Sequence, residues 1–175
     1  MKKHTEFTFD LPALRVIENE HHLLRYLMDD WHPIVLNFER DAYTLEEGHE
    51  ALKILRRKLK RFMEPLQNHK RKEERYLFSL LSQYVGNEQG PVLAVEEEHE
   101  EIKAFFDHFF HHTEGDVTTF TLAEMKEVVQ DAGEAFEIIT FHFIKEESVI
   151  FPMVEDILKP SEQYELFENL YSSII

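Results

Sequence analysis

A chain of 175 residues with 43% hydrophobic content, 15 phenylalanines and only five glycines is typical of one compact, helix-rich domain. Its formal net charge of −16 argues against a general nucleic-acid-binding protein, and no apolar run is long enough to cross a membrane. Cysteine is absent, which excludes disulfides and sulfur-ligated metals, and the first residues carry no apolar signal-peptide core, so we expect a cytoplasmic protein.

The N-terminal part of the chain predicts an extended arm and then a helix. The arm is expected over residues 1–9, and Asp10 is a candidate N-cap for a helix with Pro12 in its first turn. This helix is expected to reach about Arg40, and Pro33 to end its first part or kink it.

A long second helix follows. Thr44 and Glu47 form a capping box at its start, and it is expected to end near Val85, before a glycine. Pro65 lies inside this helix and is expected to kink it, because proline removes one backbone hydrogen bond.

The remaining helices are delimited in the same way. A third helix is expected over residues 91–112, and the capping box of Thr121 and Glu124 opens a fourth over residues 122–152. A terminal helix is expected over residues 160–175. The predicted fold class is all-α, an up-down-up-down four-helix bundle, with the arm before it and the terminal helix packed on it.

A repeated phrase within residues 10–159, the predicted bundle domain, carries the chemistry. The pattern His-x-x-Lys-Glu-Glu-x-x-(Leu/Ile)-Phe begins at His69 and again at His142. In each copy the histidine and the first glutamate, Glu73 or Glu146, lie four residues apart on one helix face, among apolar side chains. Such buried groups must be hydrogen-bonded, neutralised or metal-bound.

Each copy is preceded by a helix with its own inward histidine. His21 lies on the apolar stripe of the first helix, whereas His22 points away from it, and His99 lies on the apolar stripe of the third. The separation of each histidine from the copy that follows it is closely similar. This duplication predicts a pseudo-two-fold site with a metal pair at its centre.

The predicted ligands are imidazoles and carboxylates on apolar helix faces. They are His21, His69, Glu73, His99, His142 and Glu146. Without sulfur, such a set suits iron, manganese or zinc, and six residues supply too few donors to saturate two octahedral ions, which leaves positions for water, O2 or NO. A single buried histidine would be better explained as a hydrogen-bonded core residue, but six ligands in a duplicated pattern favour a metal site.

Two Glu-His dipeptides and the second copy of the phrase resemble the hemerythrin-like HHE cation-binding domain. These segments are Glu20-His21, Glu98-His99 and residues 142–152, and the resemblance covers residues 10–155. It implies a non-haem di-iron centre in a four-helix bundle, with the four histidines as terminal ligands and the two glutamates bridging the metals.

One position departs from the oxygen-carrying hemerythrins, which have a second histidine one turn after the ligand of the third helix. Here that position is Lys103. The ligand pattern is therefore more similar to that of the di-iron proteins that repair iron centres under nitrosative and oxidative stress. Those usually carry a Cys-containing N-terminal domain that this sequence does not contain.

Other acidic and histidine residues leave alternatives open. Glu18 and Glu96, each three residues before a predicted ligand, match the Glu-x-x-His element of ferritin-like di-iron bundles, but they lie about 100° off the apolar stripe, and His69 and His142 are then unexplained. Glu74 and Glu147 are either acceptors for imidazole N–H groups or solvated charges. A second pair, His108 and His112, could bind zinc but faces away from His99.

Three functions remain open from the sequence. The first is a di-iron protein that binds or reduces O2 or NO, in iron handling or the response to oxidative and nitrosative stress. The second is a non-catalytic iron store, donor or sensor. The third is an interaction module that offers an acidic protein partner the basic stretch at residues 56–75, for which a solvated helix face is the other explanation. Whether the protein is an enzyme, and its oligomeric state, are left open by these patterns.

Overall fold

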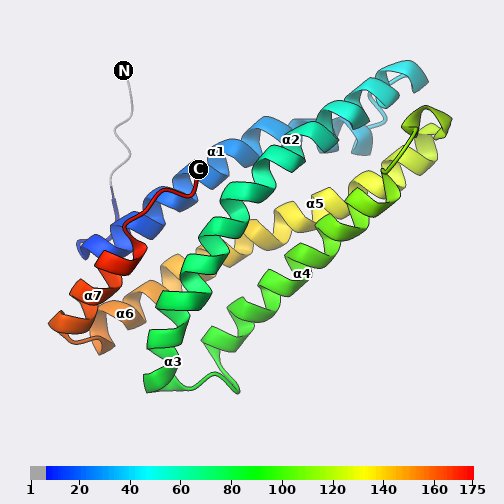
Figure 1. Cartoon of the computed structure of the whole chain (residues 1–175). Coiled ribbons are helices and arrows are strands. Elements are labelled where there is room, and N and C mark those ends of the chain that lie inside the picture. Colours follow the sequence, from blue (N-terminus) through cyan, green and yellow to red (C-terminus); the bar gives the residue numbers. More distant parts are fainter. Residues whose placement is uncertain (1–6) are drawn as a thin grey trace, which may run out of the picture.

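Four long helices of alternating direction form a bundle in the computed structural model, which describes residues 7–175 (Figure 1). They are α1 (Pro12–Glu39), α2 (Leu45–Lys72), α4 (Pro91–His112) and α5 (Leu122–Lys145). Within the described range there is no strand. The predicted all-α, four-helix architecture is therefore confirmed.

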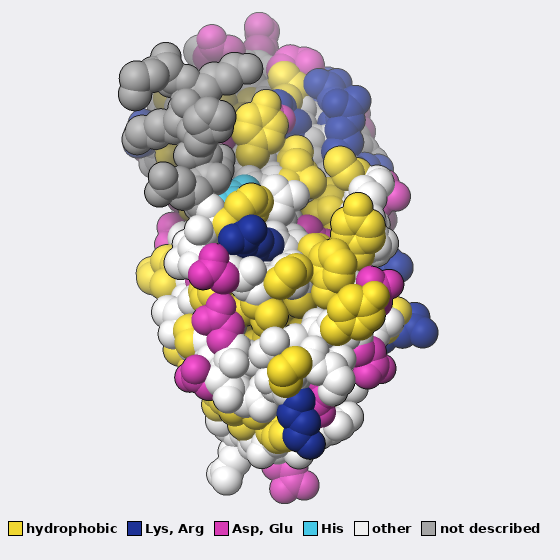
Figure 2. Space-filling model, turned by 90° about the vertical axis from the view of Figure 1, so that its left-hand side faces the viewer, with side chains coloured by type: hydrophobic (Ala, Val, Ile, Leu, Met, Phe, Trp, Pro, Cys, Tyr) yellow, Lys and Arg dark blue, Asp and Glu magenta, His cyan; other side chains and the backbone are white. Residues whose placement is uncertain are grey.

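Shorter segments extend and close the bundle. The helix α2 continues through η1 (Glu73–Phe78) into α3 (Ser79–Val85). In the same way, α5 continues through η3 (Glu146–Ile150) into α6 (Phe151–Ile157). A 3-10 turn, η2 (Val117–Thr119), links α4 to α5, and α7 (Pro160–Leu170) packs against α1 and η1. Figure 2 views the end of the molecule where α6 and α7 lie, and shows hydrophobic side chains among acidic and basic ones.

Both predicted capping boxes are formed. The Thr44 hydroxyl accepts a hydrogen bond from the backbone N–H of Glu47 (3.3 Å), and the Glu47 carboxylate accepts one from the N–H of Thr44 (2.8 Å). Thr121 and Glu124 make the same reciprocal pair. These boxes satisfy N–H groups that have no partner within the helix and so define where α2 and α5 begin.

Two predicted boundaries are wrong, and for Pro33 one of the two predicted alternatives is excluded. α1 begins after Leu11 with no side-chain cap, because the carboxylate of Asp10 instead accepts a hydrogen bond from Arg15 (3.1 Å). Pro33 does not end the helix, which continues to Glu39. The terminal helix stops at Leu170, and the residues after it follow the bundle surface without helical structure.

Two π-helical segments, η1 and η3, were not predicted, and each starts at a predicted glutamate ligand. In a regular α-helix Phe78 would lie about 140° around the axis from Glu73, whereas the wider π turn reduces this angle. Both side chains are fully buried as a result. The same holds for Glu146 and Phe151 in η3 and the start of α6.

The apolar core is divided into two clusters by a polar layer. One cluster extends from Leu24 and Phe62 toward the α1–α2 and α4–α5 connections, and the other packs Leu14, Phe78 and Phe151 under α7. The predicted ligands lie between them, so they are enclosed by apolar side chains along the bundle axis.

No helix in the described part of the chain is long and apolar enough to span a bilayer. The division into an arm, a bundle domain over residues 10–159 and a C-terminal helix stays a prediction. Residues 1–6 of the predicted arm lie outside the described residues.

The caps can be tested by substitution. We expect Thr44→Ala to lower the free energy of unfolding by about 1 kcal/mol, because an N-cap hydrogen bond is lost, and to lower the melting temperature by about 2–4 °C. Asp10→Ala is the matched control, since Asp10 caps no helix, and it should change the melting temperature by much less. Equal melting curves for the two variants would contradict the assigned start of α2.

Candidate metal centre

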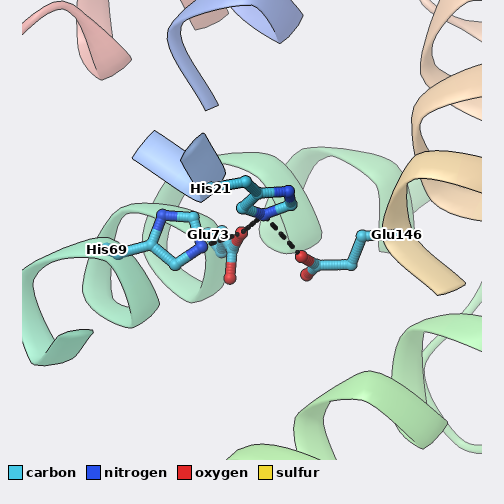
Figure 3. A group of neighbouring side chains, drawn as sticks. All are labelled: His21, His69, Glu73 and Glu146. Atoms are coloured by element: carbon cyan, nitrogen blue, oxygen red, sulfur yellow. Dashed lines mark ion pairs between the residues drawn. The ribbon is translucent and has the colours of Figure 1, made fainter. Parts of the chain in front are cut away.

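Six buried side chains from the four long helices and the π-helical segments that extend two of them meet in the polar layer. They form two groups, each with ligand atoms within 4.8 Å of one another: His21, His69, Glu73 and Glu146, and then Glu73, His99, His142 and Glu146. Figure 3 shows the first group, with the imidazoles of α1 and α2 turned toward the two carboxylates. All six residues named from the sequence are brought together, and both groups share the two glutamates.

Each shared glutamate faces one histidine from each group. The Oε1 atom of Glu73 lies 2.8 Å from Nε2 of His69, and its Oε2 atom lies 3.3 Å from Nε2 of His99. Glu146 repeats the arrangement, because Oε2 lies 3.0 Å from His21 and Oε1 lies 3.2 Å from His142. Each carboxylate thus spans the two groups, as a ligand that bridges two cations would.

The outward nitrogen of every imidazole is tied to a second carboxylate. The Nδ1 contacts are His21 with Glu147 (2.8 Å), His69 with Glu20 (3.4 Å), His99 with Glu74 (2.9 Å) and His142 with Glu98 (2.9 Å). A carboxylate at Nδ1 requires the proton there, which leaves the lone pair on Nε2. In its neutral form, each of the four rings therefore presents a lone pair to the centre of the bundle.

Basic side chains hold these outer carboxylates in turn. Arg25 donates two hydrogen bonds to Glu147 (2.8 and 3.0 Å), and Lys72 contacts Glu20 at 2.6 Å. Lys145 binds the Glu98 carboxylate in the same way. The lysine of each copy of the repeated phrase, Lys72 and Lys145, thus neutralises the carboxylate that orients the histidine three residues before it.

Sequence reasoning proposed Glu74 and Glu147 as acceptors but missed this role for Glu20 and Glu98. Both of these residues directly precede a predicted ligand, yet each contacts the histidine of the following long helix. The Glu-His dipeptide, which occurs twice, was the signal in the sequence that could have indicated this role. Which histidine each glutamate contacts depends on how neighbouring helices are aligned.

Several ligand atoms have no hydrogen bond although they are buried. They are Nε2 of His21 and His69 and all four carboxylate oxygens of Glu73 and Glu146. The Nε2 atoms of His99 and His142 lie 3.0 Å apart, where two lone pairs would repel. Two donors that each lie about 2.1 Å from one ion at right angles are about 3 Å apart. The donor set therefore fits a pair of cations.

Charge within the cluster raises the pKa values of the imidazoles and lowers those of the two central glutamates. Burial alone would lower the pKa of His142, but the neighbouring carboxylates of Glu146 and Glu98 raise it to about 10. Burial would raise the pKa of Glu73, yet the neighbouring imidazoles hold it well below its usual range. In the metal-free protein, protons are therefore held by the imidazoles, which are the stronger bases, and not by the buried glutamates.

Other predicted candidates lie away from the cluster. The Glu18 carboxylate accepts a hydrogen bond from the backbone N–H of Thr8 (2.7 Å), so it secures the segment before α1 and is not a ligand. Glu96 belongs to neither ligand group, which leaves the ferritin-like alternative without support. Lys103 is exposed and pairs with Asp107, and His108 and His112 are exposed on α4.

A cavity of about 300 Å³ reaches the cluster between α2 and α4. Three predicted ligands form part of its wall: His69, His99 and His142. The rest of the wall is mostly apolar, and it consists of Met63, Leu66, Ile102, Ile139, Phe143 and a few polar side chains around Lys70 and Lys103. Small molecules could approach the centre from this side.

The opposite flank, between α1 and α5, is filled. Phe143, directly after His142, stacks on the His21 ring with 4.1 Å between centroids, and Arg25 lies over its other side. In the first copy of the phrase the corresponding residue is Lys70, which reaches outward to Glu100 (2.8 Å). This pair of residues breaks the pseudo-two-fold symmetry, and the cavity lies on the side of Lys70.

The raised pKa of His142 makes a prediction for the metal-free protein. Its value of about 10 exceeds that of an unfolded histidine, about 6.5, so protonation at this site stabilises the fold, and this stabilisation is lost as pH rises toward 10. We expect the melting temperature to fall by at least about 4 °C over this range, the shift that about 2 kcal/mol produces in a chain of this size. Metal-loaded protein should lack the drop, since cations replace the protons. Parallel melting curves in both forms would contradict this assignment.

The comparisons with known proteins agree with this geometry. The family model of the hemerythrin HHE cation-binding domain matches residues 13–154, which contain all six clustered side chains. No curated protein and no solved structure gives a significant match. Since the family model covers most of the chain, this protein belongs to the hemerythrin HHE cation-binding domain family.

Proposed function

We propose that the cluster holds two non-haem iron ions, with His21 and His69 on one ion and His99 and His142 on the other. Glu73 and Glu146 bridge the two. The observation that carries this proposal is that each glutamate places one oxygen against a histidine of each group, at 2.8 to 3.3 Å. No other polar group competes for these oxygens, because they have no hydrogen-bond partner.

The number of donors favours iron over zinc. Each ion would receive two imidazole nitrogens and one oxygen from each glutamate, which is four protein donors. Zinc in protein sites is usually saturated by four ligands, whereas iron and manganese accept more, so iron keeps positions open for a further ligand. The four outer carboxylates raise the basicity of the imidazoles and so support a cation of higher charge.

The further ligand in this proposal is a small diatomic molecule, O2 or NO. The cavity between α2 and α4 supports this, because its wall combines three imidazoles of the centre with apolar side chains. An uncharged diatomic pays little desolvation on entering such a cavity, and bound iron supplies the redox chemistry and the attachment point. Iron handling or the response to oxidative and nitrosative stress is the role we propose, and the cytoplasmic location stays a prediction from the sequence.

Metal content tests the site itself. We expect protein loaded anaerobically with iron to retain about two ions per chain after desalting, by elemental analysis, since each of the two ligand groups holds one ion. His21→Ala should lose metal because it removes a donor, whereas His22→Ala, a half-buried neighbour outside both groups, should keep it. One ion per chain in the parent would rule out the dinuclear centre.

Access through the cavity gives a separate test. We expect Lys70→Phe to fill the opening as Phe143 fills the other flank, and so to slow the absorbance change on mixing iron-loaded protein with NO by about tenfold or more, equivalent to about 1.4 kcal/mol in barrier height. Iron content should stay the same. Lys70→Ala is the matched control, because it removes the same charge and ion pairs but leaves the cavity open. An unchanged rate in Lys70→Phe would mean that NO enters elsewhere, and equal slowing in both variants would assign the effect to the lost charge.

A further inference from the structure

A second cavity, of about 560 Å³, lies between α2 and the loop from α4 to η2, and it shares no lining residue with the cavity at the metal centre. We call it the basic cleft after the five basic side chains that line it: Lys53, Arg56, Arg57, Lys60 and Arg61. Asp116 is the one acidic residue in its wall. A cleft with this excess of positive charge stands out in a chain with a net charge of −16.

The cationic side chains gather here because they are spaced at three and four residues along α2. Lys53, Arg57 and Arg61 follow one another at intervals of four, so like charges lie one turn apart and destabilise the helix. An anion bound in the basic cleft would relieve this repulsion.

Two of the five side chains are engaged in the fold. Arg56 donates a hydrogen bond to the carbonyl of Phe110 (2.8 Å) and another to the Thr113 hydroxyl, so it fixes the loop that forms the far wall. Lys53 pairs with Glu50 at 2.7 Å. The contacts of Arg56 thus connect the two walls of the cleft.

The other three side chains are available to a ligand. Arg57, Lys60 and Arg61 are exposed and make no ion pair or side-chain hydrogen bond with any residue in the range 7–175. The acidic wall residue is not paired with them, and its carboxylate accepts hydrogen bonds from the backbone N–H (2.9 Å) and hydroxyl (2.6 Å) of Thr118.

We propose that the basic cleft binds a small molecule that carries two or more phosphate groups. Arginine presents a planar fork of donors that matches phosphate oxygens, and two arginines with a lysine between them can contact adjacent phosphates. The volume falls in the range of about 300–1,000 Å³ that small-molecule sites occupy. This site is separate from the metal centre, and the proposal does not depend on the iron assignment.

The structure disfavours the acidic protein partner expected for the whole stretch at residues 56–75. Several basic side chains of that stretch are already paired within the chain: Lys58 with Asp30, Lys70 with Glu100, and Lys72 with Glu20. Arg71 and Arg75 are unpaired within the range 7–175 but lie outside the basic cleft, so the free charge is divided between separate sites, whereas a protein partner needs one surface of about 800 Å².

Calorimetric titration with inorganic triphosphate at about 0.15 M salt tests the proposal, since screening there removes weak, distant attraction. We expect saturable binding of one triphosphate per chain. Arg57→Ala/Arg61→Ala should weaken it at least about tenfold, because two phosphate contacts are lost. Lys58→Ala/Lys126→Ala is the matched control, because it also removes two positive charges, each paired with an aspartate outside the cleft, and it should bind as the parent does.

Three outcomes would overturn the proposal. The first is no saturable binding by the parent, and the second is equal weakening in both double variants, which would indicate a general charge effect. The third is binding of a poly-glutamate peptide but not of triphosphate, which would assign the cleft to an acidic protein. Extraction of metal by triphosphate would not imitate a positive result, because the metal centre is intact in both double variants.

Discussion

The structure depends on how two carboxylates, Glu73 and Glu146, are accommodated between two apolar clusters. Neither is exposed to solvent, and the polar atoms that face their oxygens are imidazole nitrogens at 2.8 to 3.3 Å. Burying such charges is costly unless positive charge lies beside them. Protonation among the imidazoles, whose pKa values are raised, supplies it in the metal-free protein, and a pair of cations would supply it more strongly. Metal binding and the stability of the bundle centre are therefore coupled.

The layers around these carboxylates alternate in charge. Imidazoles surround the central carboxylates, outer carboxylates hold the imidazoles, and basic side chains hold the outer carboxylates. This order fixes each histidine ring with its lone pair inward. It also explains why lysine occurs in both copies of the repeated phrase, since Lys72 and Lys145 neutralise the carboxylates of Glu20 and Glu98. Substitution of either lysine would disturb a histidine that it does not touch.

The two halves of the bundle are nearly symmetric, and the positions at which they differ lie beside the cavity between α2 and α4. Phe143 closes the flank between α1 and α5, whereas Lys70 leaves the flank between α2 and α4 open. Arg25 reaches Glu147 across the closed flank, but Lys103, its counterpart on α4, turns outward to Asp107. Within the range 7–175, the cavity of about 300 Å³ that reaches the two similar ligand groups lies on the α2–α4 side, and the proposed small-molecule ligand would enter from there.

Local patterns in the sequence determined the helices, their capping boxes and the six inward side chains, because helix phase and caps depend on residues a few positions apart. The tertiary structure alone decided three features. The π turns at Glu73 and Glu146 arise because ligands and core residues must face inward together. The pairing of Glu20 with His69 depends on the alignment of neighbouring helices, and the one open flank depends on how Phe143 packs on His21. Contacts between residues distant in sequence are set by packing, which no local pattern contains.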